Sequence, residues 1–399
     1  MMLERKTSKL LSSLLVSSVL LSSCGWFGDP ETDTEETDTE EEMPSDENGT
    51  SDQKETEGDT TEETDSEEDS EENSEEDEQD EVDQDLTVWF PKVEDTLLDF
   101  EGEGNEFAPF TRYPQFVKDD TIQMVDSTGG TDVVTIYEYT EDEVREIFVR
   151  SETYFREDFQ DTGLESEQKD FEIILQLPLE EGHSWESPSG TTSEITEVAV
   201  DKELDFGSVT ALEVTRTAEN GSETVEYFAE DIGLVERVFR GEGEGSDVRS
   251  TLRSRSEDTP EEFPLTVYSV DDQAMGLDST SVTMELYTNE PARLALAEIL
   301  RGQAPDTETA QVIAESTEIN FMYLRQDGVV HADFSVDLAD MNAGSGVEAM
   351  ILQGIVNTIG GYYNVEEVLL TLDNEPYESG HILLEEGETL SVDHSNVNE

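Results

Sequence analysis

Residues 29–85 are the segment that most limits what this chain can fold into. Of these 57 residues, 31 are Asp or Glu and Lys54 is the only base, while Met43 and Val82 are the only large apolar residues. A segment so poor in apolar side chains buries too little surface to offset the entropy of ordering its backbone. We therefore expect a disordered, solvated spacer, which repulsion between its carboxylates extends further.

The rest of the chain is also strongly acidic. The 399 residues hold 102 acids and 21 bases, and residues 86–399 alone hold 70 acids and 17 bases, a net charge of −53. This charge excludes nucleic-acid binding through phosphate neutralisation, which needs clustered Lys and Arg. Self-repulsion destabilises such a body at low salt, whereas at 1 M salt charges are screened beyond about 3 Å. The composition therefore predicts a halophilic protein that works in a salt-rich setting.

The first 24 residues have the pattern of an export signal. Three bases among the first nine residues precede a stretch of 12 residues, Leu10 to Leu21, that contains only Leu, Val and Ser. This length suits the apolar core of a signal peptide and is too short to span a bilayer. The stretch ends in Leu21-Ser22-Ser23-Cys24, which resembles the lipobox of bacterial lipoproteins.

The lipobox resemblance gives a role to the only cysteine of the chain. It implies that residues 1–23 are a signal peptide and that Cys24 becomes the lipidated N-terminus, with palmitate among its acyl chains. Two or more acyl chains hold a protein stably at a membrane. We therefore expect a protein tethered to the extracytoplasmic face of the cell membrane; an ordinary secretory signal with an incidental cysteine is the alternative. A single cysteine also excludes an internal disulfide and a cysteine-based zinc site.

Residues 86–256 have the pattern of a β-rich antiparallel domain. Apolar alternation recurs in short runs separated by turns that contain glycine, and the runs are 133–139, 144–149, 171–177, 209–215, 224–228 and 234–239. Runs at this spacing favour an antiparallel meander that forms a curled sheet or a small barrel. We expect the glycine-rich stretch 241–245 and the polar stretch 254–262 to separate this domain from the next.

Residues 264–395 predict an α+β domain in the order β-β-α-β-β-α-β. The expected strands are 265–270, 282–287, 319–324, 329–334 and 365–372. The first helix is expected from Pro291 to Gly302. The second is expected to open with a capping box of Ser345 and Glu348 and to end at Gly360-Gly361. We expect both helices to cover one face of a single sheet.

This second domain resembles the GerMN family, a module of sporulation and spore germination lipoproteins. The resemblance is carried by the helix 292–302, the strand 319–324, the hairpin 327–335 and the segment 355–373. It implies an extracytoplasmic, non-enzymatic module that supports self-association or docking to another envelope protein. GerMN modules also occur in lipoproteins of bacteria that form no spores, so the resemblance alone leaves the process open.

The sequence shows no spacing typical of catalysis or of a metal site. The histidines lack the i, i+4 spacing of a helical metal site; they are His183, His331, His381 and His394. Paired acids such as Asp333/Asp337 and Glu366/Glu367 occur by chance in so acidic a chain, and Asp333 is the one acid we single out, because it lies in a strand of alternating apolar residues. We therefore expect no enzyme, no cofactor and no bound metal.

Three functions follow from these patterns. The first is a lipid-anchored assembly module linked to sporulation or germination. The second is a lipoprotein that binds cell-wall glycan or a partner enzyme through its β-rich domain, with an aromatic surface drawn from Trp89, Phe90, Tyr113, Tyr154, Phe155, Tyr362 and Tyr363. The third is a wall hydrolase that uses paired carboxylates. We favour them in this order, since most of these aromatic residues fit core positions.

Overall fold

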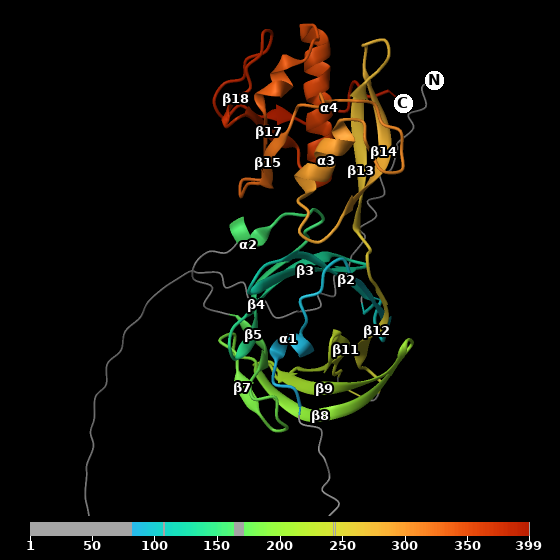
Figure 1. The fold of residues 1–399 in the computed structure, drawn as a ribbon, viewed down its shortest axis with the longest axis vertical. Helices are drawn as coiled ribbons and strands as arrows, with labels where there is room; N and C mark the ends of the chain where they lie inside the picture. Colours follow the sequence, from blue (N-terminus) through green and yellow to red (C-terminus); the bar gives the residue numbers. More distant parts are fainter. Residues whose placement is uncertain (1–81, 107, 163–170, 242, 244, 399) are drawn as a thin grey trace, which may run out of the picture. The chain divides into compact units, whose positions relative to one another are not determined.

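The computed structural model describes residues 82–106, 108–162, 171–241, 243 and 245–398 (Figure 1). The predicted signal peptide, Cys24 and most of the acidic spacer lie outside these residues. The last four residues of the predicted spacer, 82–85, belong to the folded body instead. Val82 packs against the core of the first sheet, and Gln84 Oε1 accepts a hydrogen bond of 2.9 Å from the backbone N–H of Leu179.

One antiparallel sheet of 12 strands forms the first part of the folded body. Its order is β6-β5-β4-β3-β2-β1-β12-β11-β10-β9-β8-β7, so β1 and β12 join two sequential meanders. The strands are β1 (Leu97–Glu103), β2 (Phe110–Val117), β3 (Thr121–Thr128), β4 (Asp132–Tyr139), β5 (Glu143–Ser151), β6 (Glu172–Gln176), β7 (Ser184–Glu186), β8 (Thr192–Leu204), β9 (Gly207–Thr217), β10 (Glu223–Ala229), β11 (Gly233–Phe239) and β12 (Val248–Ser256).

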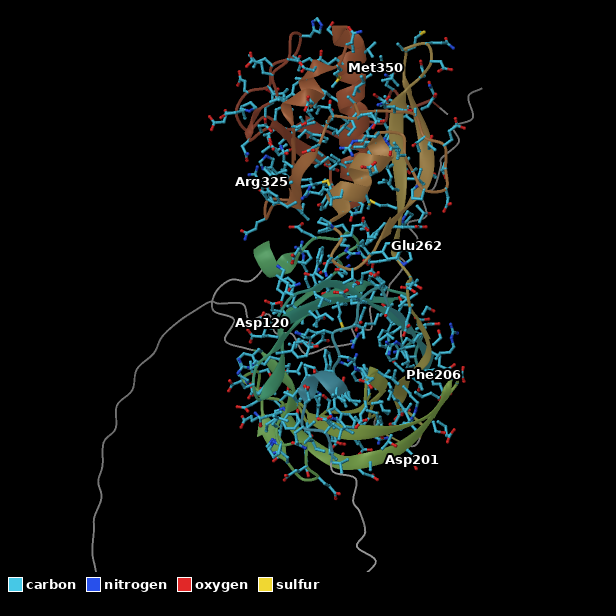
Figure 2. All side chains as sticks on the ribbon, viewed as in Figure 1. Asp120, Asp201, Phe206, Glu262, Arg325 and Met350 are labelled. Carbon is cyan, nitrogen blue, oxygen red and sulfur yellow. The ribbon has the colours of Figure 1, made fainter. Side chains whose placement is uncertain are left out.

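Side chains, not a backbone ladder, join the two end strands β6 and β7. Ser187 Oγ accepts a hydrogen bond of 2.9 Å from the N–H of Ile173, and Trp185 Nε1 donates to the Ile173 carbonyl at 3.0 Å. The sheet curls around the short helix α1 (Leu86–Trp89), so that Trp89 and Phe90 lie in its core (Figure 1). On its outside, the turn between β8 and β9 leaves Phe206 48% exposed (Figure 2).

One of the two stretches that we expected to separate the domains lies within the first sheet. The glycine-rich stretch 241–245 lies between β11 and β12, and β12 pairs with both β11 and β1. The expectation for 241–245 is wrong, because another strand of the same sheet follows this stretch. The sequence did not predict β12, because Arg and Ser alternate along much of it and Leu252 is its only fully buried apolar residue. Cross-strand hydrogen bonds hold such a strand in a sheet even where its side chains are polar.

The C-terminal part contains a two-stranded ribbon, helices and a small mixed sheet. Its elements are β13 (Glu261–Val270), β14 (Leu277–Leu286), α3 (Ala292–Leu300), β15 (Ile319–Leu324), β16 (Val330–Phe334), the 3₁₀ helix η1 (Val336–Asp340), α4 (Ser345–Tyr363), β17 (Glu367–Leu372), β18 (Glu375–Pro376) and β19 (Leu390–Ser391). A four-residue helix, α2 (Phe159–Thr162), precedes β6 in the chain. Strands β16 and β17 are parallel, and the other pairs are antiparallel.

The expectation of a single sheet with both helices on one face is wrong. Among the described strands, β13 and β14 pair only with each other, and α4 packs on β13 while also touching the mixed sheet. Helix and strand approach closely because residue 354 is glycine: a Cβ there would lie 2.6 Å from the Tyr268 carbonyl oxygen. The N–H of Tyr268 donates to Thr358 Oγ1 at 3.1 Å, so α4 accepts one backbone donor from the outer edge of β13.

Helix α4 also runs past its predicted end. It passes through Gly360 and Gly361 and stops at Asn364, whose φ of 54° is in the left-handed region. Gly360 serves a close approach instead, because a Cβ at that position would lie 2.3 Å from a methyl group of Val392. None of the helices in the described residues has the length and apolar content needed to cross a membrane.

Candidate functional site

A chain of hydrogen-bonded side chains crosses the mixed sheet from β15 to β17. Nδ1 of His331 lies 3.3 Å from the Tyr323 hydroxyl, and Nε2 lies 2.9 Å from Thr371 Oγ1. The Thr371 hydroxyl donates to Oδ1 of Asp333. Strand register produces this chain, because Tyr323 is opposite His331 and Asp333 is opposite Thr371.

These hydrogen bonds assign the tautomer of His331. Thr371 has a single hydroxyl hydrogen, which it gives to Asp333, so it accepts from His331 and Nε2 carries the ring hydrogen. Nδ1 then accepts from Tyr323. Burial lowers the pKa of His331 from its usual 6.5, and the Asp333 carboxylate opposes that shift only in part. His331 is therefore neutral near pH 7.

Asp333, the acid that the sequence singled out, is a fully buried turn anchor. Besides the hydrogen bond from Thr371, it accepts one of 2.8 Å from Asn320 Nδ2 and one of 2.7 Å from the backbone N–H of Asn374. Asp373 and Asn374, just after β17, have φ of 47° and 70°. Asp333 holds this left-handed turn against the sheet, and an acid used in this way is poorly placed to transfer protons to a ligand.

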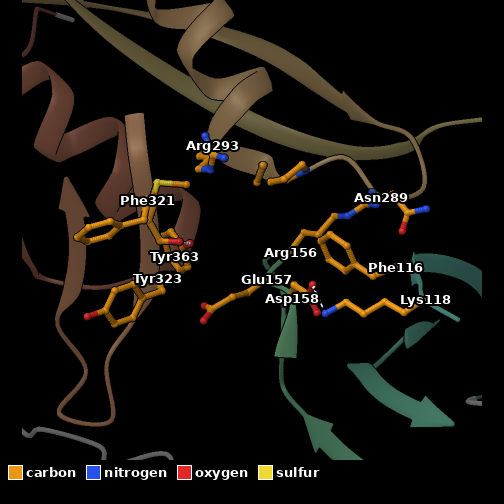
Figure 3. Close-up of a pocket in the computed structure, with 13 residues that line it drawn as sticks. Phe116, Lys118, Arg156, Glu157, Asp158, Asn289, Arg293, Phe321, Tyr323 and Tyr363 are labelled. Carbon is orange, nitrogen blue, oxygen red and sulfur yellow. Dashed lines mark hydrogen bonds and ion pairs between the residues drawn. The ribbon is translucent and has the colours of Figure 1, made fainter. Parts of the chain in front are cut away.

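A cavity of about 470 Å³ lies beside Phe321 and Tyr323 of β15 (Figure 3). Its volume is in the range of small-molecule sites. The polar groups in its wall are already used within the protein: Arg293 Nη1 donates to the Ile319 carbonyl at 3.0 Å, and Glu157 Oε2 accepts from the Leu324 N–H at 3.1 Å. The other lining residues are Phe116, Lys118, Arg156, Asp158, Asn289, Pro291, Ala292, Met322 and Tyr363.

Arg156, on the wall of this cavity, connects three segments of the chain. Its side chain is 1% exposed; Nη1 donates to the Leu286 carbonyl at 3.1 Å and Nη2 to the Tyr287 carbonyl at 2.7 Å. Nη2 also donates to the Gln115 carbonyl of β2, and Nη1 lies 3.4 Å from Oε2 of Glu261. The guanidinium thus ties β2 and the segment before β6 to both strands of the ribbon.

Glu261 is the carboxylate that faces this guanidinium. Gln115 Nε2 donates to its two oxygens at 3.0 and 3.1 Å. Burial raises the pKa of Glu261 to about 7, although Arg156 and Gln115 favour the ionised form. Sequence reasoning missed both residues, because Arg156 and Glu261 are 105 positions apart and neither belongs to a motif.

The curled sheet holds a second group of buried charges. Although burial raises it, the pKa of Glu226 is held down at about 2 by Arg216 and Arg237, whose Nε atoms lie 2.6 and 2.7 Å from its oxygens. Arg112 and Asp126 form a bidentate ion pair, in which Nε and Nη2 each lie 2.7 Å from a carboxylate oxygen. These charges neutralise one another within the protein, which indicates a structural role.

The predicted capping box of α4 is wrong. The N-cap is Gly344, which has no side chain to cap the helix, while Glu348 turns inward and is 2% exposed. Its Oε1 accepts a hydrogen bond of 2.9 Å from the Tyr377 hydroxyl and another from Ser379 Oγ. Glu348 therefore holds the segment after β18 against the helix, and Ser345 is left exposed at the surface.

The remaining singled-out residues do not converge on one site. Tyr154 is 51% exposed, whereas the other six aromatic residues of the predicted glycan surface are buried. Nε2 of His183 lies 3.2 Å from Gln176 Oε1, while His381 and His394 are exposed. Within the described ranges, no three His, Cys, Asp or Glu side chains gather as a metal site. The acids paired in the sequence are also separate, since Asp337 meets Ser335 while Glu366 and Glu367 are exposed.

Residues 266–378 match the family model Germane, described as sporulation and spore germination. Among solved structures, the tandem GerMN domains of the sporulation protein GerM from Bacillus subtilis are 20% identical, with a TM-score of 0.27 over 34% of this chain and 48% of that one. This chain thus spans about half of that structure.

Two further solved structures are similar to parts of the chain. One, described as a lipoprotein from Clostridium perfringens, is 15% identical, with a TM-score of 0.21 over 33% of this chain and 87% of that one. Another, described as an exported protein with a YmcC-like fold from Bacteroides fragilis, is 8% identical, with a TM-score of 0.26 over 43% of this chain and 99% of that one. No curated protein matches the sequence.

Proposed function

We propose, from the premise that residues 266–378 are a Germane domain, that this chain is a non-enzymatic, lipid-anchored envelope protein of sporulation or spore germination. The family match over these residues is the observation that carries the proposal. The domain acts as an assembly module that contacts further copies or another envelope protein. This role needs no reactive group, and it agrees with Asp333, Glu348 and Glu261, whose partners lie within the protein.

The anchor in this proposal is a diacylglyceryl group on Cys24. The acidic spacer then separates the folded body from the membrane; a flexible chain of its length spans about 45 Å, and like charges extend it. Labelling with a palmitate analogue in the native host should mark the wild-type protein and leave Cys24→Ser unlabelled. Equal labelling of both would remove the anchor from the proposal.

The link to spores is tested by deletion of the gene. Loss of the protein should lower the yield of heat-resistant spores or their germination, and the full chain should restore it. A chain with the destabilising change Gly354→Ala in the Germane domain should restore it poorly, whereas Gly361→Ala, in the same helix, should restore it fully. Normal sporulation and germination without the protein would overturn this part of the proposal.

Cell-wall binding by the β-rich domain is the second candidate, and the structure favours it less. Of the seven aromatic residues predicted for the glycan surface only Tyr154 is exposed, and Glu226 in the sheet interior pairs with Arg216 and Arg237. A glycan platform needs aromatic faces open to solvent. Sedimentation with purified cell wall, with Tyr154→Ala as the comparison, tests this candidate: binding that depends on Tyr154 would favour it over assembly.

A further inference from the structure

Strand β14 presents backbone groups along its outer edge. On the other strand of the ribbon, the N–H of Tyr268 points away from β14, because it donates to Thr358. Tyr268 is opposite Ser279, so this is a non-hydrogen-bonded pair and the N–H and C=O of Ser279 also point outward. Alternation along the strand gives the same direction to Ser281, Thr283 and Glu285.

These outward groups have no partner in the described part of the chain. The only pairing on that side is at the start of the strand, where the Leu277 N–H donates to Asn396 at 2.9 Å and the Asn398 N–H donates to Leu277 at 2.7 Å. From residue 279 to residue 285, no described backbone or side chain bonds the outer edge. Ser279, Ser281 and Thr283 are also exposed on the face of the ribbon.

Other long strand edges in the described chain are protected: where β8 extends past β7, it carries Glu197, Asp201, Lys202 and Glu203 and two register shifts. Helix α4 covers β13, and Glu157 and Arg293 form hydrogen bonds with the edge of β15. Strand β7 is only three residues long, and β6 is hydrogen-bonded to the side chain of Ser187. By contrast, β14 has ten residues in regular register and no charge from Ser279 to Met284. Proteins usually guard such edges with charges, bulges or covering segments, because an open edge accepts another strand.

We propose that the outer edge of β14 pairs antiparallel with β14 of a second copy of this chain. The inference rests on the proposed assembly role and names the surface that performs it. The free segment 279–285 is centred on Val282, which places the two-fold axis there. Ser281 then faces the partner's Thr283, and Ser279 faces the partner's Glu285, with backbone hydrogen bonds between these residues.

The edge is self-complementary in this register, which favours a second copy over an unrelated strand. A body with a net charge of −53 repels its own copies almost everywhere, so two copies approach best along an uncharged strand. A basic partner would gain more from the acidic surfaces than from this edge. In the centred register Glu285 faces a serine and Asp278 faces the partner's Leu286, so no two carboxylates are directly opposed.

Disulfide trapping tests both the surface and its register. Two full-length chains, Ser281→Cys and Thr283→Cys, each also carrying Cys24→Ser, are mixed in about 3 M KCl, where charges are well screened. Residues in a hydrogen-bonded antiparallel pair have Cα atoms about 5.5 Å apart, which suits a disulfide. The mixture should give a disulfide-linked dimer, and either chain alone should give much less. Glu262→Cys, on β13 of the same ribbon, mixed with Ser281→Cys is the control for random collision.

A proline variant gives an independent measurement. Ser281→Pro removes an N–H that points outward and is not used within the chain; Pro264, opposite Thr283, already occupies an equivalent position on β13. Circular dichroism should show that the variant remains folded. Sedimentation should show that it associates at least about tenfold more weakly than wild type.

The outcomes separate this inference from the proposed function. Association of the wild type without specific trapping, and without an effect of Ser281→Pro, would overturn the β14 interface and leave the assembly role standing. A wild type that stays monomeric at every concentration and salt would overturn both. Trapping of Ser281→Cys to a different envelope protein in cells, without dimers, would replace the second copy by a foreign strand.

Discussion

Nη1 of Arg156 lies 3.4 Å from Oε2 of Glu261, where β2 meets the ribbon; the arginine is fully buried and the glutamate largely so. The guanidinium also donates to the Leu286 and Tyr287 carbonyls. Breaking a buried pair from one side leaves an unpaired charge and unsatisfied carbonyls, at a cost of about 3–5 kcal/mol.

Arg156→Met should therefore lower the free energy of unfolding by about 3–5 kcal/mol in urea titrations at high salt. Arg253→Met is the matched control, because Arg253 is 53% exposed in its pair with Asp99. Exposed pairs contribute at most about 1 kcal/mol. Equal losses in the two variants would show that the Arg156 contacts do not stabilise the fold.

Glu261 should make stability depend on pH, because burial raises its pKa from 4.5 in the unfolded chain to about 7 in the folded one. Below pH 4.5 both states hold the proton. As the pH rises to about 7 the unfolded state releases its proton first, so the folded state loses stability, by at most about 3 kcal/mol, and the loss is constant at higher pH. Glu261→Gln should remove this component.

The comparison is a set of urea titrations between pH 4 and 8 on wild type, Glu261→Gln and Glu262→Gln. The last variant removes one charge at the neighbouring exposed position and controls for net charge. The difference between wild type and Glu261→Gln should grow with pH over this range. A difference that does not change with pH would contradict the raised pKa.

Glu348 and Ser345 distinguish the observed helix start from a capping box. Glu348→Ala leaves the Tyr377 and Ser379 hydroxyls without their acceptor and opens a buried space, so we expect a loss of about 2–3 kcal/mol. Ser345→Ala should change stability by less than about 0.5 kcal/mol, since Ser345 makes no capping bond. A loss near 1 kcal/mol for Ser345→Ala, typical of a true cap, would contradict the structure.

Two glycines of α4 should respond to alanine with opposite signs. At Gly354 the added methyl group would lie 2.6 Å from the Tyr268 carbonyl oxygen, so helix and strand must separate and we expect a loss of about 1–3 kcal/mol. At Gly361 the added methyl group meets nothing within 4 Å, and alanine should stabilise the helix by about 0.5–1 kcal/mol. Thermal unfolding of both variants measures the difference.

His331 offers a spectroscopic test of the hydrogen-bonded chain on the mixed sheet. Nitrogen NMR should show hydrogen on Nε2 at pH 7 and a protonation midpoint below 6.5. Thr371→Val removes the acceptor of that hydrogen and should shift the tautomer toward Nδ1, while the exposed His381 keeps its signals. An unchanged His331 spectrum in Thr371→Val would contradict the assignment.

Local patterns predicted the elements whose side chains alternate cleanly. Strand β4 and the hairpin at Asp327-Gly328 follow from their sequences, and Leu324 is indeed opposite Val330 across that turn. Strand β12 was not predicted, because Arg and Ser alternate along much of it and its place depends on pairing with β1, which is distant in the chain. No local pattern reports such a partner.

The buried polar residues show a second limit of sequence reasoning. Ser345 and Glu348 have the spacing of a capping box, yet Glu348 serves Tyr377 and Ser379 because the fold brings that segment over the helix. The same spacing fits both uses, and only tertiary contacts decide between them. Asp333 was noticeable because it interrupts an apolar strand, although its task is to hold a turn.

The pairing of β1 with β12 also constrains the order of folding. Leu97 is opposite Ser256, so the curled sheet cannot close until nearly the whole of that domain has left the ribosome or the export channel. Each six-strand meander can form from neighbouring strands, but joining them requires a long loop to close, and the entropy cost of that closure slows folding. The export proposed above would meet this requirement, since both meanders would reach the same compartment before either must find the other.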